Sequence, residues 1–326
     1  MAKHSLEHSD KPSCVFYSSA FPIGEYRVKQ LWLLIIVFSF VFYFNPFTGF
    51  IYIFLCLQLN WPLQKISEME AAVSNDGSKL AFRGVVNGNS DIYISNLDGT
   101  NPKRITHWDS NEGGPSWSPS GEKISFFSNK SGNFEVYVFD LKSESIKRVS
   151  YDSGLNLASF WLDAEDTLFY TSDTNEEVRF YNLKTNDDGH WSSLYEHHSI
   201  ITQSKVSKTL WGVMKIEKDW ELAKIPRDGK NPEIVASHPS RDSEPSESPD
   251  GLSVVFASKR TNDGWQIFHM KSDGTNIEQL TTVGRNNGPS WLDNERIIFS
   301  SSRNGETHLF ELNLKEGTEQ KFNIDW

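Results

Sequence analysis

Residues 113–141 read GGPSWSPSGEKISFFSNKSGNFEVYVFDL, and this stretch decides the fold. It contains a short apolar run, a Pro/Gly turn, an alternating apolar run, a polar turn, and a run of β-branched and aromatic residues. Alternating runs separated by turn residues predict antiparallel strands. The same pattern recurs along the chain, and a fixed period predicts a repeat architecture.

The repeat is measured from the last residue of the second run, called the anchor here. Successive anchors lie 42 to 44 residues apart, and a third run follows each anchor by 11 or 12 residues. The anchors are Phe82, Phe126, Tyr170, Gly212, Phe256 and Phe299, and the third-run residues are Tyr93, Tyr137, Tyr181, Ala223, Phe268 and Phe310. Four short strands in each such period are typical of a β-propeller blade. Six anchors predict six blades.

The outer strands and the turns fit the same period. Fourth strands are predicted at Arg104–Thr106, Arg148–Ser150, Glu233–Val235, Gln279–Thr281 and Lys321–Asn323. Asp-Gly pairs, at Asp98-Gly99, Asp228-Gly229 and Asp273-Gly274, are expected to join third to fourth strands, because Gly accepts a positive φ. Trp117, Trp161 and Trp291 stand at one repeat position, which predicts packing between sheets rather than a stacking platform for a ligand.

The motif P-S-W-S-P-x-G…F-x-S…G-x-x-x-V-Y-x-x-D-L resembles the six-bladed propeller repeat of the TolB-like proteins. Related repeats occur in the propellers of prolyl oligopeptidases and dipeptidyl peptidases. The resemblance covers Met69–Trp326 and is weakest in blades 3 and 4. It implies an all-β, six-bladed propeller and a place in the envelope complexes of Gram-negative bacteria. It does not fix function, because propellers are scaffolds for unrelated functions.

Catalytic and cofactor motifs are not found in the sequence. It has no Gly-x-Ser-x-Gly elbow, so no accompanying peptidase domain is predicted, and no phosphate loop or His-Glu-x-x-His. His190, His197 and His198 are interpreted as a polar surface loop rather than a metal site. We therefore predict no catalytic residues, no cofactor and no metal.

Charge and cysteine content restrict the partners. The net charge is −11, and residues 1–30 carry four basic and three acidic residues, which leaves −12 on the rest of the chain. Such an acidic body argues against a nucleic-acid partner. Cys14 and Cys56 both precede the repeats, so the propeller has no disulfide and the redox compartment stays open.

The N-terminal part is predicted to anchor the protein. Residues 1–30 form a polar tail, 31–59 carry no charge, and 60–68 form a short linker to the propeller at 69–326. About 20 apolar residues cross a bilayer as a helix. A single span is favoured over a re-entrant hairpin interrupted at Asn45-Pro46. Arg27 and Lys29 before the span place the propeller in the periplasm, on the bacterial inner membrane.

Partner binding is expected on variable loops. In a four-stranded blade, the loops joining strands 2 and 3 and the connectors between blades share one face, and here they vary in sequence. Candidate partner-binding residues there are His107, Trp108, Asp109, Tyr151, Arg241, Arg260, Arg285 and Arg303. We expect Trp108→Ala to weaken partner capture while leaving folding nearly intact, with Asp273→Ala as the change on the other face.

The sequence leaves three hypotheses for the function and two candidate segments for the strand that closes the ring. The leading hypothesis is a membrane-anchored, non-catalytic propeller that binds a protein or peptide partner. The alternatives are a hydrolase or lyase using the propeller channel, which requires inward His, Asp or Glu side chains with perturbed pKa values, and a periplasmic sensor domain. Either Leu63–Ser67 or Glu319–Ile324 could supply the strand that completes the last blade.

Overall fold

The structure is a computed structural model that describes residues 65–326 except 152–154, 162–166, 173–176, 184–185, 187, 191–197, 204–208, 217–218 and 227–230. The described residues belong to one compact unit, Gln64–Trp326. The predicted tail and membrane segment lie outside the described residues. Within those residues no helix has the length and apolarity needed to cross a membrane.

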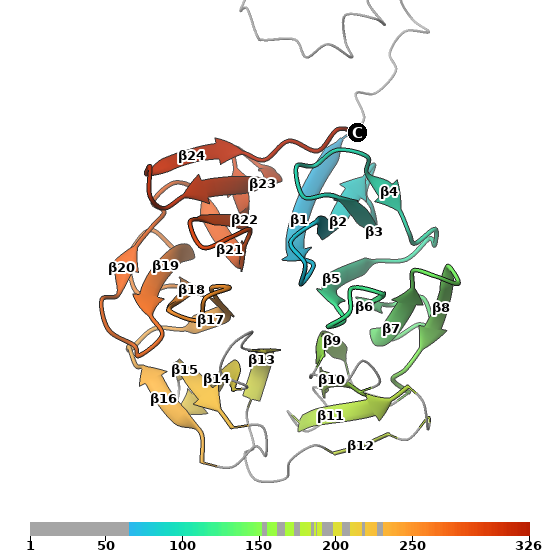
Figure 1. Cartoon of the computed structure of the whole chain (residues 1–326), viewed down its shortest axis with the longest axis horizontal. Coiled ribbons are helices and arrows are strands. Elements are labelled where there is room, and N and C mark those ends of the chain that lie inside the picture. Colours follow the sequence, from blue (N-terminus) through green and yellow to red (C-terminus); the bar gives the residue numbers. More distant parts are fainter. Residues whose placement is uncertain are drawn as a thin grey trace, which may run out of the picture. The chain divides into compact units, whose positions relative to one another are not determined.

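The described residues form strands arranged in six four-stranded antiparallel sheets, which agrees with the six repeat anchors (Figure 1). Blade 1 comprises β1 (Ile66–Val73), β2 (Lys79–Val86), β3 (Asn89–Asn96) and β4 (Lys103–Arg104). Blade 2 comprises β5 (Glu112–Trp117), β6 (Lys123–Ser128), β7 (Glu135–Asp140) and β8 (Ser145–Arg148). Blade 3 comprises β9 (Asn156–Trp161), β10 (Thr167–Ser172), β11 (Glu177–Asn182) and β12 (Asp188–His190).

The second half repeats this order. Blade 4 comprises β13 (His198–Gln203), β14 (Leu210–Ile216), β15 (Asp219–Ile225) and β16 (Glu233–Ala236). Blade 5 comprises β17 (Asp242–Glu247), β18 (Ser253–Ser258), β19 (Gln266–Lys271) and β20 (Glu278–Gln279). Blade 6 comprises β21 (Arg285–Trp291), β22 (Arg296–Arg303), β23 (Glu306–Asn313) and β24 (Thr318–Lys321). β1 begins three residues before the predicted boundary at Met69.

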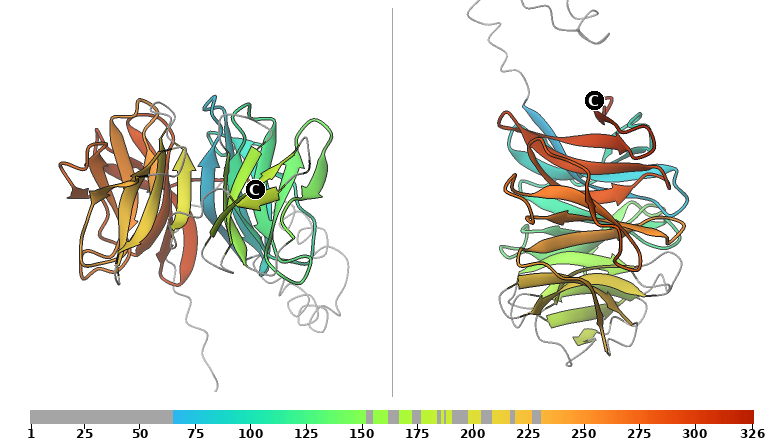
Figure 2. Two further views of the ribbon diagram at one scale, coloured as in Figure 1. Left: turned by 90° about the horizontal axis from the view of Figure 1, so that it is seen from below. Right: turned by 90° about the vertical axis from the view of Figure 1, so that its left-hand side faces the viewer.

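The first strand of every blade lies innermost, and each contacts the first strand of the next blade around a closed ring (Figure 1). The strands of a blade run between the two faces of the propeller, so all loops emerge on one face or the other (Figure 2). This radial arrangement leaves only the short fourth strands as outer edges, which limits edge-to-edge aggregation.

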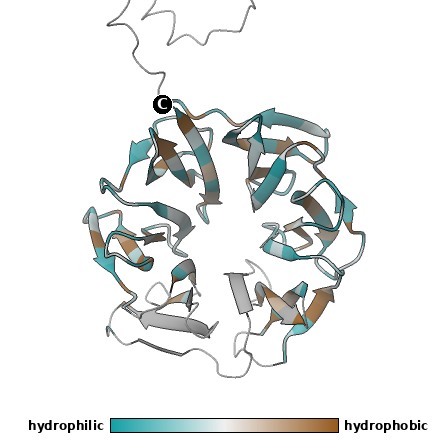
Figure 3. Ribbon diagram, turned by 180° about the vertical axis from the view of Figure 1, so that it is seen from behind, coloured by the Kyte–Doolittle hydropathy of each residue, from teal (hydrophilic) through white to brown (hydrophobic). Residues whose placement is uncertain are grey.

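The apolar anchors explain why the blades stack. Phe82, Phe126, Phe256 and Phe299 are fully buried, and each stacks on the aromatic residue opposite it in the third strand. Hydrophobic residues are concentrated in the strands, while the loops are mostly hydrophilic (Figure 3). Burial of these rings at about 25 cal/mol per Å² supplies much of the driving force for folding.

The three repeated tryptophans pack between blades, as predicted. Trp117, Trp161 and Trp291 are buried, and each indole Nε1 donates to a main-chain oxygen of the preceding blade. The distances are 3.0 Å to Ala72, 3.2 Å to Ser116 and 2.9 Å to Ser246. They are structural residues that fix the spacing of neighbouring sheets.

The fourth strands end earlier than predicted in four of the five predicted places. In blade 1, β4 ends at Arg104, because the next two residues turn inward to the end of the third strand. Ile105 N donates to Ile92 O, and the Thr106 hydroxyl accepts from Ile92 N at 3.0 Å while donating to buried Asp91. In blades 2 and 5 the hydroxyls of Ser150 and Thr281 accept a hydrogen bond from the equivalent main-chain N–H of the third strand.

The ring closes without exchange of strands between blades. β1 pairs within blade 1 and β24 within blade 6, so of the two predicted closures Glu319–Ile324 is nearer the structure. Beyond β24 the chain crosses to blade 1, where Asp325 N donates to Gly99 O and Trp326 packs on Phe82 and Tyr93. Gly84 leaves room for this indole, since a Cβ there would lie 2.8 Å from the Trp326 ring.

The contact between blades 6 and 1, called the seam here, also includes a buried polar cluster. Glu68 is 4% exposed, and its two oxygens accept from the Trp326 Nε1 at 2.7 Å and contact the His308 Nδ1 at 2.6 Å. Glu70 N donates to the Ser300 hydroxyl of blade 6 at 2.9 Å. Closure therefore rests on the last two residues, which pack and hydrogen-bond on blade 1, and on hydrogen bonds from β1 to β22 and β23 of blade 6.

Candidate functional site

Two sets of loops define the two faces of the propeller. The variable-loop face carries the loops between second and third strands and the connectors between blades. The Asp-Gly face carries the loops between first and second and between third and fourth strands. On the Asp-Gly face the Asp98 and Asp273 carboxylates each accept from the main chain and the hydroxyl of a following threonine, which lowers the pKa of both carboxyls. That face is formed by rigid, repeated turns.

The structure places the predicted partner-binding residues on the variable-loop face in three different environments. His107, Asp109, Arg241 and Arg285 are exposed. Tyr151 is 62% exposed, lies 4.6 Å under the Arg148 guanidinium, and donates its hydroxyl to Arg148 O. These exposed side chains are the part of the predicted set that is free to meet a partner.

The prediction that Trp108 is a loop residue with little burial has to be corrected. Trp108 belongs to a connector, but its ring packs on Phe126 at 6.1 Å and on Tyr137 at 5.3 Å and contacts the core of blades 1 and 2. The expectation that Trp108→Ala would leave folding nearly intact is therefore wrong, because the substitution removes half-buried aromatic packing. The repeat spacing concealed this contact, since connectors are the least regular part of the period.

Arg260 and Arg303 are held mainly by their own blades. The Arg260 side chain is 10% exposed, pairs with Asp242 at 2.7 Å, and lies over Phe256 and Phe268. Arg303 lies 3.9 Å over Phe310 and pairs with Glu319 at 2.6 Å. Both guanidiniums have a carboxylate partner and an aromatic ring beneath them, so neither is available to a partner without breaking these contacts.

Three cation–aromatic pairs were missed by the sequence analysis. Lys130 lies 3.7 Å over Trp108, Lys259 lies 5.1 Å over Trp265, and Arg241 lies 5.6 Å over Trp220. In each pair at least one residue belongs to a loop. Of the three basic residues, only Arg241 is in the predicted partner-binding set. The available signal was the recurrence of a tryptophan near a basic residue at strand ends, which no fixed spacing marks.

Two glutamates of the innermost strands were also missed. Glu70 and Glu244 have positive φ values of 54° and 53°, at the bulge where blades 2 and 6 have Gly114 and Gly288. Each carboxylate accepts from the glycine N–H of a neighbouring blade, at 2.7 Å and 2.6 Å. The signal was a Glu at the repeat position that blades 2 and 6 fill with Gly, 44 residues further along the chain.

Charges of both signs act on these two glutamates of the innermost strands. Burial raises the pKa of the Glu244 carboxyl, the negative charge of Glu70 raises it further, and Arg241 and Arg285 oppose the shift. Glu70 itself pairs with Arg83 at 3.0 Å. Since blade 6 separates blades 1 and 5, these charges interact across the inner ring. Within the described residues, no group of three or more His, Cys, Asp or Glu side chains could hold a metal ion.

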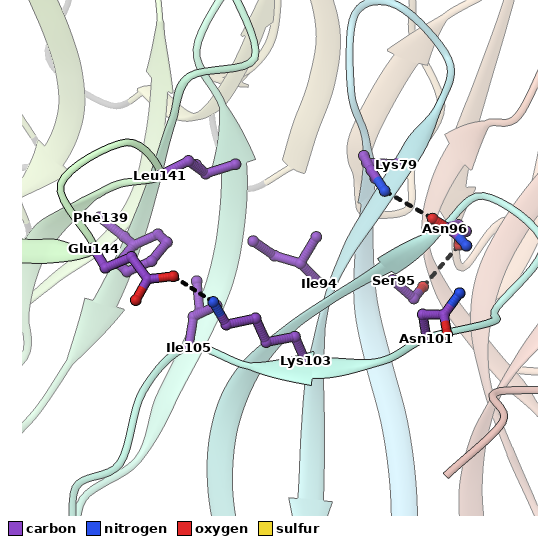
Figure 4. A pocket seen from close by; sticks show the side chains of 10 residues that line it. All are labelled: Lys79, Ile94, Ser95, Asn96, Asn101, Lys103, Ile105, Phe139, Leu141 and Glu144. Atoms are coloured by element: carbon purple, nitrogen blue, oxygen red, sulfur yellow. Dashed lines mark hydrogen bonds and ion pairs between the residues drawn. The ribbon is translucent and has the colours of Figure 1, made fainter.

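A pocket of about 250 Å³ lies on the other face, between blades 1 and 2 (Figure 4). Its apolar wall includes Ile94, Ile105 and Phe139. Its polar groups are already engaged, since Lys103 pairs with Glu144 at 2.5 Å and Lys79 donates to Asn96 at 2.7 Å. The pocket is smaller than most ligand sites and is formed by the gap between adjacent outer strands.

Comparison with known proteins supports the fold class. Residues 64–200 match the family model described as TolB beta propeller domain. TolB from Acinetobacter baumannii is similar in structure, with a TM-score of 0.65 and 13% identity over 79% of this chain and 63% of that chain. A putative TolB from Agrobacterium tumefaciens has a TM-score of 0.59 and 14% identity over 68% and 84%. The chain thus spans less than two thirds of the Acinetobacter protein.

An enzyme shares the same fold. An oligogalacturonate lyase in complex with manganese has a TM-score of 0.54 and 16% identity over 78% of each chain. No curated protein sequence matches this chain. At these identities the similarity establishes the fold and not the activity. The protein is an all-β propeller protein, and residues 64–200 resemble the TolB propeller, as the repeat motif predicted.

Proposed function

We propose that this protein is a membrane-anchored, non-catalytic propeller that binds a protein partner through the variable-loop face. The observation that carries the proposal is the contrast between the two faces. The Asp-Gly turns satisfy their own polar groups, whereas the variable-loop face exposes Arg241, Tyr151 and, at the start of β21, Arg285. Tyr and Arg are enriched among the residues that dominate binding energy at protein interfaces.

The inner-ring carboxylates meet one requirement of the enzyme alternative, because burial and the charge of Glu70 raise the pKa of the Glu244 carboxyl, but both carboxylates are already engaged in structural contacts. The Glu70 and Glu244 carboxylates each bind a main-chain N–H of a neighbouring blade, and Glu70 also pairs with an arginine. They stabilise the inner ring in this arrangement, which accounts for both positive-φ residues without a reaction. The lyase alternative would require a base within hydrogen-bonding reach of a substrate proton.

Partner capture provides the test. We expect Arg285→Ala, in the full chain solubilised from membranes, to reduce cross-linked partner severalfold while leaving the melting temperature unchanged, because Arg285 is exposed and in no ion pair among the described residues. Lys142→Ala is the matched control, an exposed basic residue on the Asp-Gly face. Equal capture by both variants, or equal loss from both, would contradict the assignment of the face.

The orientation has its own test. We propose that residues 31–59 anchor the chain in the bacterial inner membrane with the propeller in the periplasm, as Arg27 and Lys29 indicate. With both native cysteines replaced by serine, Asn262→Cys in an exposed loop should react with an impermeant maleimide in spheroplasts. A second variant that retains only Cys14 is the control and should react only after lysis. The reverse pattern would place the propeller in the cytoplasm.

A further inference from the structure

The two faces differ in charge. Among the fully described loops, those of the variable-loop face contain four basic residues and two acidic ones, Asp109 and Asp263. The fully described loops of the Asp-Gly face contain two basic residues and nine acidic ones. The chain after residue 30 has a net charge of −12. Within these described loops the variable-loop face is therefore the less acidic of the two faces, and a difference in charge of this kind selects and steers partners of opposite charge.

The basic residues of this face fall into two groups. Arg260 is neutralised by Asp242 and is nearly buried. Lys130, Arg241 and Lys259 are exposed, and no carboxylate among the described residues lies within ion-pair distance of them. An aromatic ring attracts a cation through its quadrupole but carries no net charge, so it leaves the cation able to bind an anion.

The tryptophan beneath each of these three cations restricts the conformations of the basic side chain. A Lys or Arg side chain lying along an indole loses part of its rotamer freedom before any partner arrives, which lowers the entropy cost of binding. The three pairs come from blades 1 and 2, 4 and 5, and 5, so the charges are distributed around the face rather than gathered in one pocket. An extended ligand suits this spacing better than a single small anion.

Apolar side chains accompany the charges. Val283 is 59% exposed in the connector before β21, and Tyr151 is 62% exposed in the connector before β9. Both lie on the variable-loop face. A partner that brings carboxylates alone would leave these side chains in water, whereas a segment with acidic and apolar residues in alternation could cover both kinds of contact.

We propose that the variable-loop face binds an acidic polypeptide segment of the partner, whose carboxylates pair with Lys130, Arg241 and Lys259. The inference rests on the proposed function, because it assigns the partner chemistry to the same face. The apolar residues of that segment lie against Val283 and Tyr151. The charge difference between the faces makes the interaction specific, since an acidic segment is repelled by the Asp-Gly face.

The experiment uses the full chain in nanodiscs of phosphatidylcholine and a phage library of random peptides of constant length. Peptides that are enriched on the protein should carry an excess of Asp and Glu over the input library. The triple variant Lys130→Gln, Arg241→Gln, Lys259→Gln should bind the enriched peptides at least about tenfold more weakly, and raising the salt concentration should weaken binding to the wild-type protein by a similar factor. The matched control is Lys142→Gln, Lys271→Gln, Lys315→Gln, with three exposed lysines of the other face, and should bind as the wild type does.

Other outcomes separate this inference from the proposed function. Enriched peptides without an acidic excess that still lose affinity in Arg285→Ala would overturn the acidic partner and leave the binding face in place. Enriched peptides that bind the triple variant normally and the lysine control poorly would overturn both, as would a library that yields no peptide. If phosphatidylglycerol protects the amides of residues 259–265 from hydrogen exchange and acidic peptides do not bind, the face takes anionic lipid and the inference is wrong.

Discussion

Trp326→Ala is expected to lower the thermal midpoint of the propeller by roughly 5–10 °C, which corresponds to about 3 kcal/mol for a domain of this size. The indole packs edge-on against Phe82 at 6.0 Å and Tyr93 at 4.9 Å, and its Nε1 is a hydrogen-bond donor to buried Glu68. Alanine removes the aromatic contact and leaves one Glu68 oxygen without its donor. Although the indole is 36% exposed, loss of a donor by the buried carboxylate adds to the cost of the lost aromatic packing.

Two further measurements define the role of Trp326. Trp326→Phe keeps a ring on Phe82 and Tyr93 but loses the donor, so its midpoint should lie between those of the wild type and the alanine variant. Hydrogen exchange should accelerate most in β1 and β23, because these strands face each other across the seam. A midpoint within about one degree of the wild type in Trp326→Ala would show that the first strands close the ring without this side chain.

Arg260→Met is the second substitution with a large expected effect, at about 3 kcal/mol at pH 8. Asp242 is fully buried, and Arg260 is its ion-pair partner at 2.7 Å. Burial raises the pKa of the Asp242 carboxyl to about 6, although the Ser258 hydrogen bond and Arg260 act in the opposite direction. Without the guanidinium, a charged Asp242 has no compensating cation in the interior.

The pH dependence has a definite sign. A carboxyl whose pKa is higher in the folded state than in the unfolded state favours folding most when it is protonated, so its contribution is present below about pH 4 and is lost as the pH rises through about 6. The destabilisation by Arg260→Met should therefore be smaller at pH 5 than at pH 8, as measured by urea unfolding of the full chain in detergent. Equal losses at both values would show that Arg260 acts through its packing on Phe256 and Phe268.

A double substitution supplies the control for the charge argument. Replacing Asp242 with Asn in the Arg260→Met background removes the buried charge together with its lost partner. Because replacing both members of a buried pair costs less than breaking it, the double variant should recover most of the lost stability and should show little change between pH 5 and pH 8.

The repeat in the sequence was sufficient to predict the propeller, and the physical reason is that each blade is a local structure. Phe82, Phe126, Phe256 and Phe299 recur at nearly constant spacing because each anchors the same position of a four-stranded sheet. Trp117 and its equivalents were correctly placed between blades for the same reason. Predictions made from the period concern contacts within a blade or between adjacent blades, and those contacts have small, regular separations in sequence.

Only the tertiary structure decided the contacts that break the period. Trp108 is a loop residue in sequence and a half-buried packing residue in space, because Phe126 and Tyr137 of the next blade lie against it. Trp326 reaches Glu68 across 258 residues, and Glu70 lies at an inner bulge where its carboxylate meets Gly114. The sequence determined the blades and the loops of each face; which loop side chains are buried, paired or free depends on neighbours that only closure of the ring brings together.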